Sequence, residues 1–172
     1  MDSLIFRKAT LDDTENLVIL KQQVWVSTYA VEGIRKEFSD YLLATFTTEN
    51  ERKNLKNQQK FTLIAESKGH LIGCAEVDLN PSESNPQVEN IPEISVLYVL
   101  ERFCGKGIGK LLLNEILSTL KDLKHNRVWL SVYHKNQRAI NFYNQNGFMD
   151  IGKMYFEMSG NSYENRIMKR EF

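Results

Sequence analysis

Apolar residues recur every three or four positions in two long parts of the chain, which is the spacing of helices that bury one face. In the first part, the apolar side is made of Leu17, Leu20, Val24 and Trp25. The residues before it, Thr10–Asp13, have the pattern of a helix-capping box. A second helical stretch covers residues 34–46, and the polar stretch 48–60 is expected to continue as helix. The other long helix is predicted over residues 108–123.

Shorter apolar runs, rich in β-branched and aromatic residues, alternate with these helices and predict strands. We expect strands at residues 4–9, 61–66, 71–78, 94–100, 128–133, 148–158 and 163–169. The run 94–100 has the composition of a central strand. A shorter helix is expected at 137–146, ending before Gly147, and three prolines make residues 79–93 a loop. The resulting order, β-αα-βββ-α-β-α-ββ, predicts an α/β fold with a mixed sheet.

Length, charge and cysteine content narrow the function class. The 172 residues suit one domain, expected over residues 1–172, and 22 basic against 22 acidic residues predict no attraction to nucleic acid or to anionic membranes. No apolar run has the length of a membrane span, and the first residues lack the pattern of a signal peptide. Cys74 and Cys104 have no His or Cys at metal-binding spacing. We therefore expect a cytoplasmic protein with two reduced thiols and no metal.

Glycines occupy alternate positions just before the long helix at 108–123. They are Gly105, Gly107 and Gly109, and Lys106 and Lys110 lie between and after them. Glycines let the backbone approach a bulky anion, while the helix N-terminus directs free N–H groups and partial positive charge at it. A phosphate or pyrophosphate site is expected here; the alternative is a tight turn with incidental glycines.

Known nucleotide-binding loops do not fit this segment. A phosphate-binding loop of the Walker type needs Ser or Thr where Leu111 stands, and its glycine spacing is one residue longer. A dinucleotide fingerprint has a different glycine spacing and lies near the start of a βαβ unit, whereas this loop lies past the middle of the chain. These differences argue against a phosphotransferase that binds ATP through the loop.

The segment that begins at Leu97 resembles the acyl-CoA loop of the GNAT superfamily of N-acetyltransferases. That loop follows the pattern Gln or Arg, two residues, Gly, one residue, and Gly or Ala. The pattern places its first position at Cys104 and its glycines at Gly107 and Gly109. Cys104 departs from the usual Gln or Arg, and Arg102 would match only out of register.

A second signature of the same superfamily follows one helix and one strand later. Its positions are filled by Asn136, Ala139, Ile140, Phe142, Tyr143, Gly147 and Phe148. Two motifs in this order and at this separation are more specific than either alone. The resemblance implies a single-domain GNAT fold with a mixed, largely antiparallel central sheet flanked by helices. Dimers are common in this superfamily, so a homodimer is also implied, but no segment identifies an interface.

The resemblance further implies that acetyl-CoA is the acyl donor. Main-chain groups of Leu97, Tyr98 and Val99 would bind its pantetheine arm and the oxyanion. The pyrophosphate would meet Cys104, Gly105, Lys106, Gly107, Ile108, Gly109 and Lys110. Asn136 would also contact the acyl donor, although the same residue reads as an ordinary cap of the helix that follows it.

Transfer to an amine requires a base and benefits from an acid, because an alkyl amine has a pKa near 10.4 and is protonated at pH 7. Tyr143 matches the residue that protonates the leaving thiolate in this superfamily; alone it would read as a core aromatic. Glu93 stands where some relatives carry the base, and it could equally be a solvated carboxylate at a strand end. Glu76 is the substitute base, and Ser95 is placed to hold a water.

The acceptor is expected to be the primary amine of a small molecule. The chain shows a weaker resemblance to bacterial polyamine acetyltransferases, and Glu32, Glu37 and Asp40 could attract a polycation or form a solvated face. Trp25, Tyr29 and Phe38 could wall a pocket or belong to the core. A protein N-terminal amine, an amino-acid derivative, and a non-catalytic sensor of acyl-CoA remain as alternatives.

Overall fold

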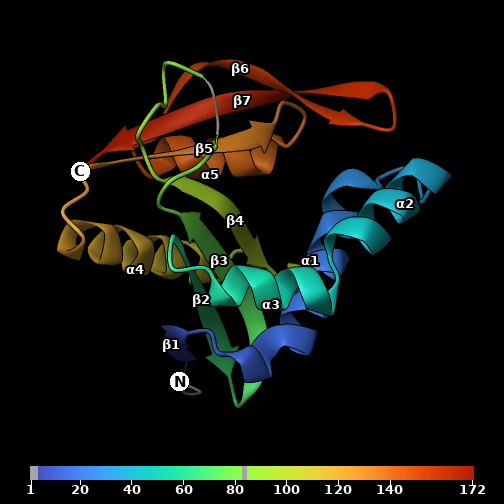
Figure 1. Cartoon of the computed structure of the whole chain (residues 1–172), viewed down its shortest axis with the longest axis horizontal. Coiled ribbons are helices and arrows are strands. Elements are labelled where there is room, and N and C mark those ends of the chain that lie inside the picture. The colour runs from blue at the N-terminus through green and yellow to red at the C-terminus, as the bar shows by residue number, and fades with distance from the viewer. Residues whose placement is uncertain (1–3, 83–84) are drawn as a thin grey trace.

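The computed structural model describes residues 4–82 and 85–172, and all described strands belong to one sheet (Figure 1). Its strands are β1 Leu4–Lys8, β2 Lys60–Ser67, β3 His70–Asp78, β4 Glu93–Val99, β5 Arg127–Tyr133, β6 Met149–Met158 and β7 Asn161–Glu171. The helices are α1 Thr14–Tyr29, α2 Lys36–Thr45, α3 Thr48–Lys56, α4 Ile108–Asp122 and α5 Gln137–Gln145. The sheet order is β1-β2-β3-β4-β5-β7-β6, and β4–β5 is the one parallel pair among the described strands. The α/β fold with a mixed, largely antiparallel sheet is therefore confirmed.

The predicted element order holds, with one helix more. The polar stretch expected to continue the second helix forms α3 separately, because Thr47 caps it: its side chain accepts a hydrogen bond from the Asn50 N–H at 3.1 Å. The turn between the last two strands consists of Ser159 and Gly160, both at positive φ, so the strands continue up to it.

Helices cover both faces of the sheet. The apolar side of α1 packs against Ile64 of β2 and Cys74 of β3, as the spacing of its leucines predicts. On the opposite face, α4 buries Leu112, Ile116 and Leu120 against the alternate residues of the same strands and of β5. Burial raises the pKa of the Cys74 thiol, which keeps it protonated and inert.

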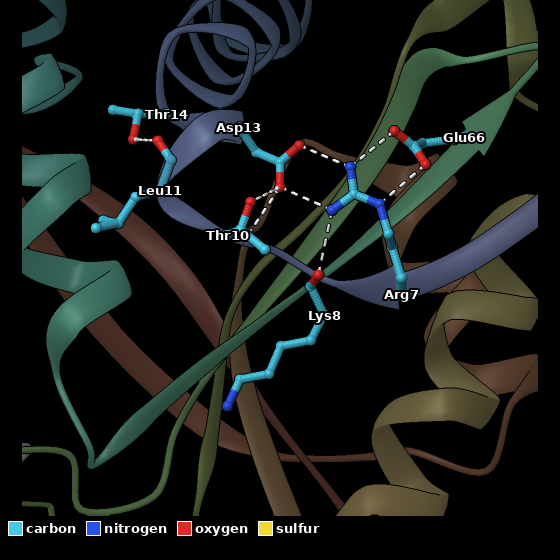
Figure 2. Close-up of polar contacts among 7 residues, drawn as sticks. All are labelled: Arg7, Lys8, Thr10, Leu11, Asp13, Thr14 and Glu66. Atoms are coloured by element: carbon cyan, nitrogen blue, oxygen red, sulfur yellow. Dashed lines mark hydrogen bonds and ion pairs between the residues drawn. The ribbon is translucent and has the colours of Figure 1, made fainter.

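The capping box at the start of α1 is part of a larger polar network (Figure 2). The Thr10 N–H donates to Asp13 Oδ2 at 2.8 Å, and a short 3₁₀ turn at Leu11–Asp13 precedes the helix. The Arg7 guanidinium lies between Asp13, with two contacts of 2.8 Å, and Glu66, with contacts of 3.0 and 2.9 Å. The network ties β1, β2 and the start of α1 together.

Asp13→Asn should lower the free energy of unfolding at pH 7 by about 1–2 kcal/mol. The hydrogen bond from Arg7 lowers the pKa of Asp13 to about 2, so this stabilisation is present above pH 4 and is lost as the pH falls towards 2. Urea unfolding at pH 7 and pH 3 would measure it. The gap between the variant and the native chain should be smaller at pH 3 than at pH 7, and Asp12→Asn at the exposed neighbour is the control; an equal gap at both pH values would contradict the assignment.

The sheet opens between its fourth and fifth strands. Within the described residues, β4 and β5 pair at one position, Glu93 opposite Trp129, next to the hydrogen bond from the Trp129 N–H to the Pro92 carbonyl at 3.0 Å. Beyond that point β4 still pairs with β3 and β5 still pairs with β7, but β4 and β5 no longer pair with each other. The gap separates a half made of β1–β4 from a half made of β5, β7 and β6.

Candidate active site

A cavity of about 1210 Å³ extends from this gap to the end of α1. Residues of β4 and β5, the first turn of α5, the segment between α1 and α2, and the β6–β7 hairpin line it. From the two diverging strands come Ser95, Tyr98, Ser131 and Tyr133. In a sheet with continuous β4–β5 pairing, hydrogen-bonded backbone would close this space. The cavity therefore depends on the divergence of the two strands.

The free edge of β4 offers main-chain groups to the gap. The Leu100 N–H donates to the Ile72 carbonyl of β3 at 3.0 Å. Successive residues of a strand direct their N–H groups to opposite edges, so those of Leu97 and Val99 are directed to the β5 side. Tyr98 is directed towards β3 by the same alternation, and its side chain lines the cavity instead. Of the three predicted main-chain contacts, two face the opening.

The glycine loop is open and rich in free donors. Gly105 and Gly107 have φ values of +75° and +82°, and an added Cβ would meet nothing within 4 Å at either position. The Leu111 N–H is bonded to the Gly107 carbonyl at 3.0 Å, so the N–H groups of the preceding three residues lie in the first turn of α4 without intrahelical partners. Lys106, stacked 5.1 Å from the Phe103 ring centre, adds positive charge. This cradle fits a diphosphate.

Two predicted residues of the loop lie against the rest of the fold. An added Cβ at Gly109 would lie 3.6 Å from the Phe142 ring of α5, so glycine allows α4 and α5 to approach. Cys104 Sγ lies 3.6 Å from the Val99 carbonyl, to which its thiol can donate. Burial raises the pKa of Cys104, which opposes thiolate formation. A neutral thiol therefore stands where the superfamily usually carries Gln or Arg.

Asn136 directly precedes α5, whereas Tyr143 lies in its last turn and is not among the residues that line the cavity. Asn136 lines the cavity, and its side chain also caps α5 by accepting from the Ala139 N–H at 3.1 Å. Tyr143 is buried, with its ring 5.3 Å from that of Phe142 and 5.4 Å from that of Phe148. Burial raises the pKa of the Tyr143 hydroxyl, so it carries a proton at neutral pH.

The two carboxylates predicted as bases have different surroundings. Glu93 lies at the closed end of the gap, where β4 and β5 still pair, and it is not among the residues that line the cavity. Glu76 is buried and forms an ion pair with Lys21 of α1. Ser95 faces the cavity, and its hydroxyl lies 3.5 Å from the Glu76 carbonyl. The structure therefore brings Ser95, but neither carboxylate, to the cavity wall.

An aromatic wall is the feature that sequence reasoning missed in large part. Eight of the lining residues are Phe, Tyr or Trp: Trp25, Tyr29, Phe38, Tyr41, Tyr98, Tyr133, Phe156 and Tyr163. Trp25 and Phe38 are also core residues, so these two side chains belong to the core and line the cavity at the same time. Burial, together with Tyr41 and Tyr133, raises the pKa of Tyr29 to about 12. For Phe156 and Tyr163, the available signal was the aromatic content of the last two predicted strands.

The described residues carry two further features that bear on the class of protein. None of their helices is both long and apolar enough to pass through a bilayer. No group of three or more His, Cys, Asp or Glu side chains in the described ranges is arranged so that it could hold a metal ion.

Comparison with known proteins agrees with this geometry. The model of the Acetyltransferase (GNAT) family matches residues 31–148. An uncharacterized N-acetyltransferase of Mycobacterium tuberculosis is 38% identical over 79 residues, 46% of this chain and 51% of the relative, so the chain spans about half the length of that relative. A spermine/spermidine N(1)-acetyltransferase of Bacillus subtilis is 32% identical over 89 residues, 51% of this chain and 59% of the relative.

Proteins of Thermoplasma acidophilum are among those that are similar over most of the chain. Its spermidine N(1)-acetyltransferase is 27% identical over 154 residues, 85% of this chain and 88% of the relative. The crystal structure of the PaiA N-acetyltransferase of that organism, in complex with coenzyme A, covers 99% of each chain with a TM-score of 0.80 at 24% identity. That structure shows the shared fold. With the family model matched over more than half of its residues, the chain belongs to the GNAT family of acetyltransferases.

Proposed function

We propose that the protein transfers the acetyl group of acetyl-CoA to the primary amine of a small molecule. The gap between β4 and β5 carries the proposal, because the free edge of β4 faces it, a large cavity opens from it, and the diphosphate cradle follows β4 in the chain. A similar fold binds coenzyme A in the Thermoplasma acidophilum protein, which supports the choice of donor. All described strands form one sheet, which supports one catalytic domain over residues 1–172.

The residues of this chain fit an acyl-CoA donor. The free N–H groups at the start of α4, with Lys106 and Lys110, would hold its pyrophosphate. The N–H groups of Leu97 and Val99 would hold the pantetheine arm, and one of them would donate to the thioester oxygen as negative charge develops on it. Asn136 would contact the arm from the other side of the gap.

The chemistry requires three proton movements: two from the nitrogen and one to the sulfur. The acceptor arrives as an ammonium ion and loses one proton; the neutral nitrogen then forms a C–N bond to the acetyl carbon as the C–S bond breaks. The leaving sulfur takes a proton from the Tyr143 hydroxyl, and the amide nitrogen sheds its second proton, which restores Tyr143 through water. The products are an N-acetylated amine, coenzyme A as free thiol, and one released proton.

Glu93 is the proposed acceptor of the first proton. Glu93 lies at the end of the gap and would act through ordered water beside Ser95. Glu93→Gln should lower kcat about 10-fold to 100-fold at pH 7 and leave the KM for acetyl-CoA unchanged. The loss should shrink as the pH is raised towards the pKa of the amine; a pH-independent loss would mark Glu93 as a structural residue.

The identity of the acceptor is the open part of the proposal. Polyamines are natural first candidates, because two relatives are named spermidine or spermine acetyltransferases. A protein N-terminal amine would enter the same cavity as an extended chain, and a sensor of acyl-CoA would use the gap without turnover.

Release of free coenzyme A from acetyl-CoA tests the function. The assay would use spermidine, spermine, amino acids, short peptides and simple amines as acceptors, with thermal unfolding in the presence of acetyl-CoA measured in parallel. Amine-stimulated release is expected, together with a rise in Tm on addition of acetyl-CoA. A rise in Tm without release would support the sensor. If acetyl-CoA caused neither release nor a rise in Tm, the proposed donor site would be wrong.

A further inference from the structure

The cavity wall is a connected cluster of aromatic rings. Trp25 lies 4.8 Å from Tyr29 and 5.3 Å from Tyr41, measured between ring centres. Tyr41 meets Phe156 of β6 edge to face at 5.4 Å, and Tyr29 lies 5.6 Å from Tyr133 of β5. The cluster therefore bridges the cavity from α1 and α2 to the half of the sheet made of β5, β7 and β6. Such walls take up flat apolar groups, with ring contacts that add to the burial of apolar area.

Charged groups around the cavity are already paired with one another. Arg35 pairs with Glu37 and donates to the Tyr163 hydroxyl at 2.6 Å, while Asn161 and Tyr163 donate to the same Glu37 carboxylate at 2.6 and 2.7 Å. These contacts close α2 against the tip of the β6–β7 hairpin, on the right of Figure 1. Two of the three acidic residues that the sequence offered for a polycation, Glu37 and Asp40, are thus paired within the fold, since Asp40 contacts Lys36 at 2.8 Å.

The remaining lining charges do not favour a polycation either. Glu101 is held by Arg138 through two contacts of 2.7 and 2.9 Å. Among the described lining residues, two charged side chains lie outside these pairs. They are Glu32, which is exposed, and Lys135, which carries the opposite charge. A polyamine carries two or more ammonium groups beside the reacting one, and burying them without carboxylates is strongly unfavourable.

We propose that the acceptor is a small primary monoamine whose amino group is joined by a short linker to an aromatic ring or a similarly flat apolar group. This inference rests on the proposed function and narrows its acceptor. The ring would lie among Trp25, Tyr41 and Phe156, and the amine would reach the gap past Tyr133. The transfer is unchanged: a C–N bond forms, the C–S bond breaks, the sulfur is protonated and one proton is released.

The first experiment compares acceptors in the coenzyme A release assay with the complete protein. Phenylethylamine and tyramine are matched against butylamine, which has one ammonium group and no ring, and against spermidine, which has several ammonium groups and no ring. We expect kcat/KM for the ring-bearing amines to exceed that of butylamine and of spermidine at least 10-fold. Preference for spermidine, or equal use of butylamine and phenylethylamine, would overturn the inference.

The second experiment removes one wall of the cavity. Phe156→Ala should lower kcat/KM for phenylethylamine about 10-fold and that for butylamine less than threefold, because the lost contact is with the ring. Phe156 is 37% exposed on the hairpin, so its truncation leaves the core intact. Tyr155→Ala is the matched control: the neighbouring residue is also aromatic, is 52% exposed and does not line the cavity. Equal effects of the two variants, or of one variant on both amines, would contradict the assignment of the ring site.

Failure of this inference differs from failure of the proposed function. Turnover with spermidine or with a peptide keeps the acetyltransferase and removes the aromatic acceptor. Protection of the fold by acetyl-CoA without turnover of any ring-bearing amine also removes it. Absence of both turnover and protection would remove the acetyl-CoA site itself.

Discussion

Tyr143→Phe is expected to lower kcat at least 100-fold while the KM for acetyl-CoA changes less than threefold. The hydroxyl is the proposed proton donor to the leaving sulfur, and loss of a general acid typically slows turnover by two to four orders of magnitude. The phenylalanine ring keeps the contacts with Phe142 and Phe148, so the fold should remain intact. Steady-state kinetics with saturating amine, together with Tm, would measure the effect.

The pH dependence separates this role from packing. A thiolate with a pKa near 8.5 needs no acid at high pH, so the defect of the Tyr143→Phe variant should shrink between pH 7 and pH 9.5. Tyr155→Phe, an exposed tyrosine to phenylalanine change on β6, is the control and should leave kcat unchanged. If kcat and acetyl-CoA binding fell together, or if Tm fell by several degrees, Tyr143 would be a packing residue.

Lys21→Met should lower the free energy of unfolding at pH 8 by about 3–5 kcal/mol. Lys21 is 1% exposed and pairs with Glu51 of α3 at 2.5 Å and with Glu76 of β3. Removing the ammonium leaves two buried carboxylates facing each other, and Glu51 already has one buried oxygen, Oε1, without a hydrogen-bond partner in the described structure. Methionine fills most of the lysine volume, so the loss reports charge rather than a cavity.

The sign of the pH effect follows from the carboxylates. Burial and the neighbouring Glu76 raise the pKa of Glu51, and Lys21 opposes that shift, so the pKa in the variant is higher still. A carboxylate with a raised folded-state pKa destabilises the fold above that pKa, and this destabilisation is lost as the pH falls. Urea unfolding should therefore show a smaller gap between variant and native chain at pH 5 than at pH 8.

Two further variants control the Lys21 experiment. Lys53→Met, at an exposed lysine of α3, should change stability by less than 0.5 kcal/mol. Adding Glu76→Gln to Lys21→Met should recover part of the stability, since one carboxylate then remains. A pH-independent gap, or no recovery in the double variant, would show that the lysine stem, rather than its charge, stabilises this part of the fold.

Local patterns were enough to predict most of the elements. The leucine spacing of α1 and α4 and the apolar run of β4 each reflect contacts within one element and its immediate neighbours, which a periodicity reports directly. The glycine loop was predictable for the same reason, because positive φ at Gly105 and Gly107 is a requirement of the local backbone. The division into α2 and α3 was missed, since one side-chain cap at Thr47 decides it.

The surroundings of the site could not be derived in the same way. Glu76 looked available from its strand, but its pairing with Lys21 joins residues 55 positions apart. The use of Glu37 by Arg35 and Tyr163 likewise depends on how α2 meets the hairpin. Long-range contacts of this kind follow from packing of the completed fold, and no periodicity in the chain encodes them. The roles of Glu93 and Tyr143 stay predictions until kinetics test them.

The single pairing between β4 and β5 has a consequence for how the width of the gap is set. The loop before β4 buries Val88 and Ile91 against Trp129, and the Ile91 carbonyl accepts a hydrogen bond from the Trp129 indole at 3.1 Å. This contact lies beside the single β4–β5 pairing, at the point from which the two halves of the sheet diverge. We therefore expect a change in the bulk of Val88 or Ile91 to alter the angle between the two halves of the sheet, and with it the range of acceptors that enter, although neither residue lines the cavity.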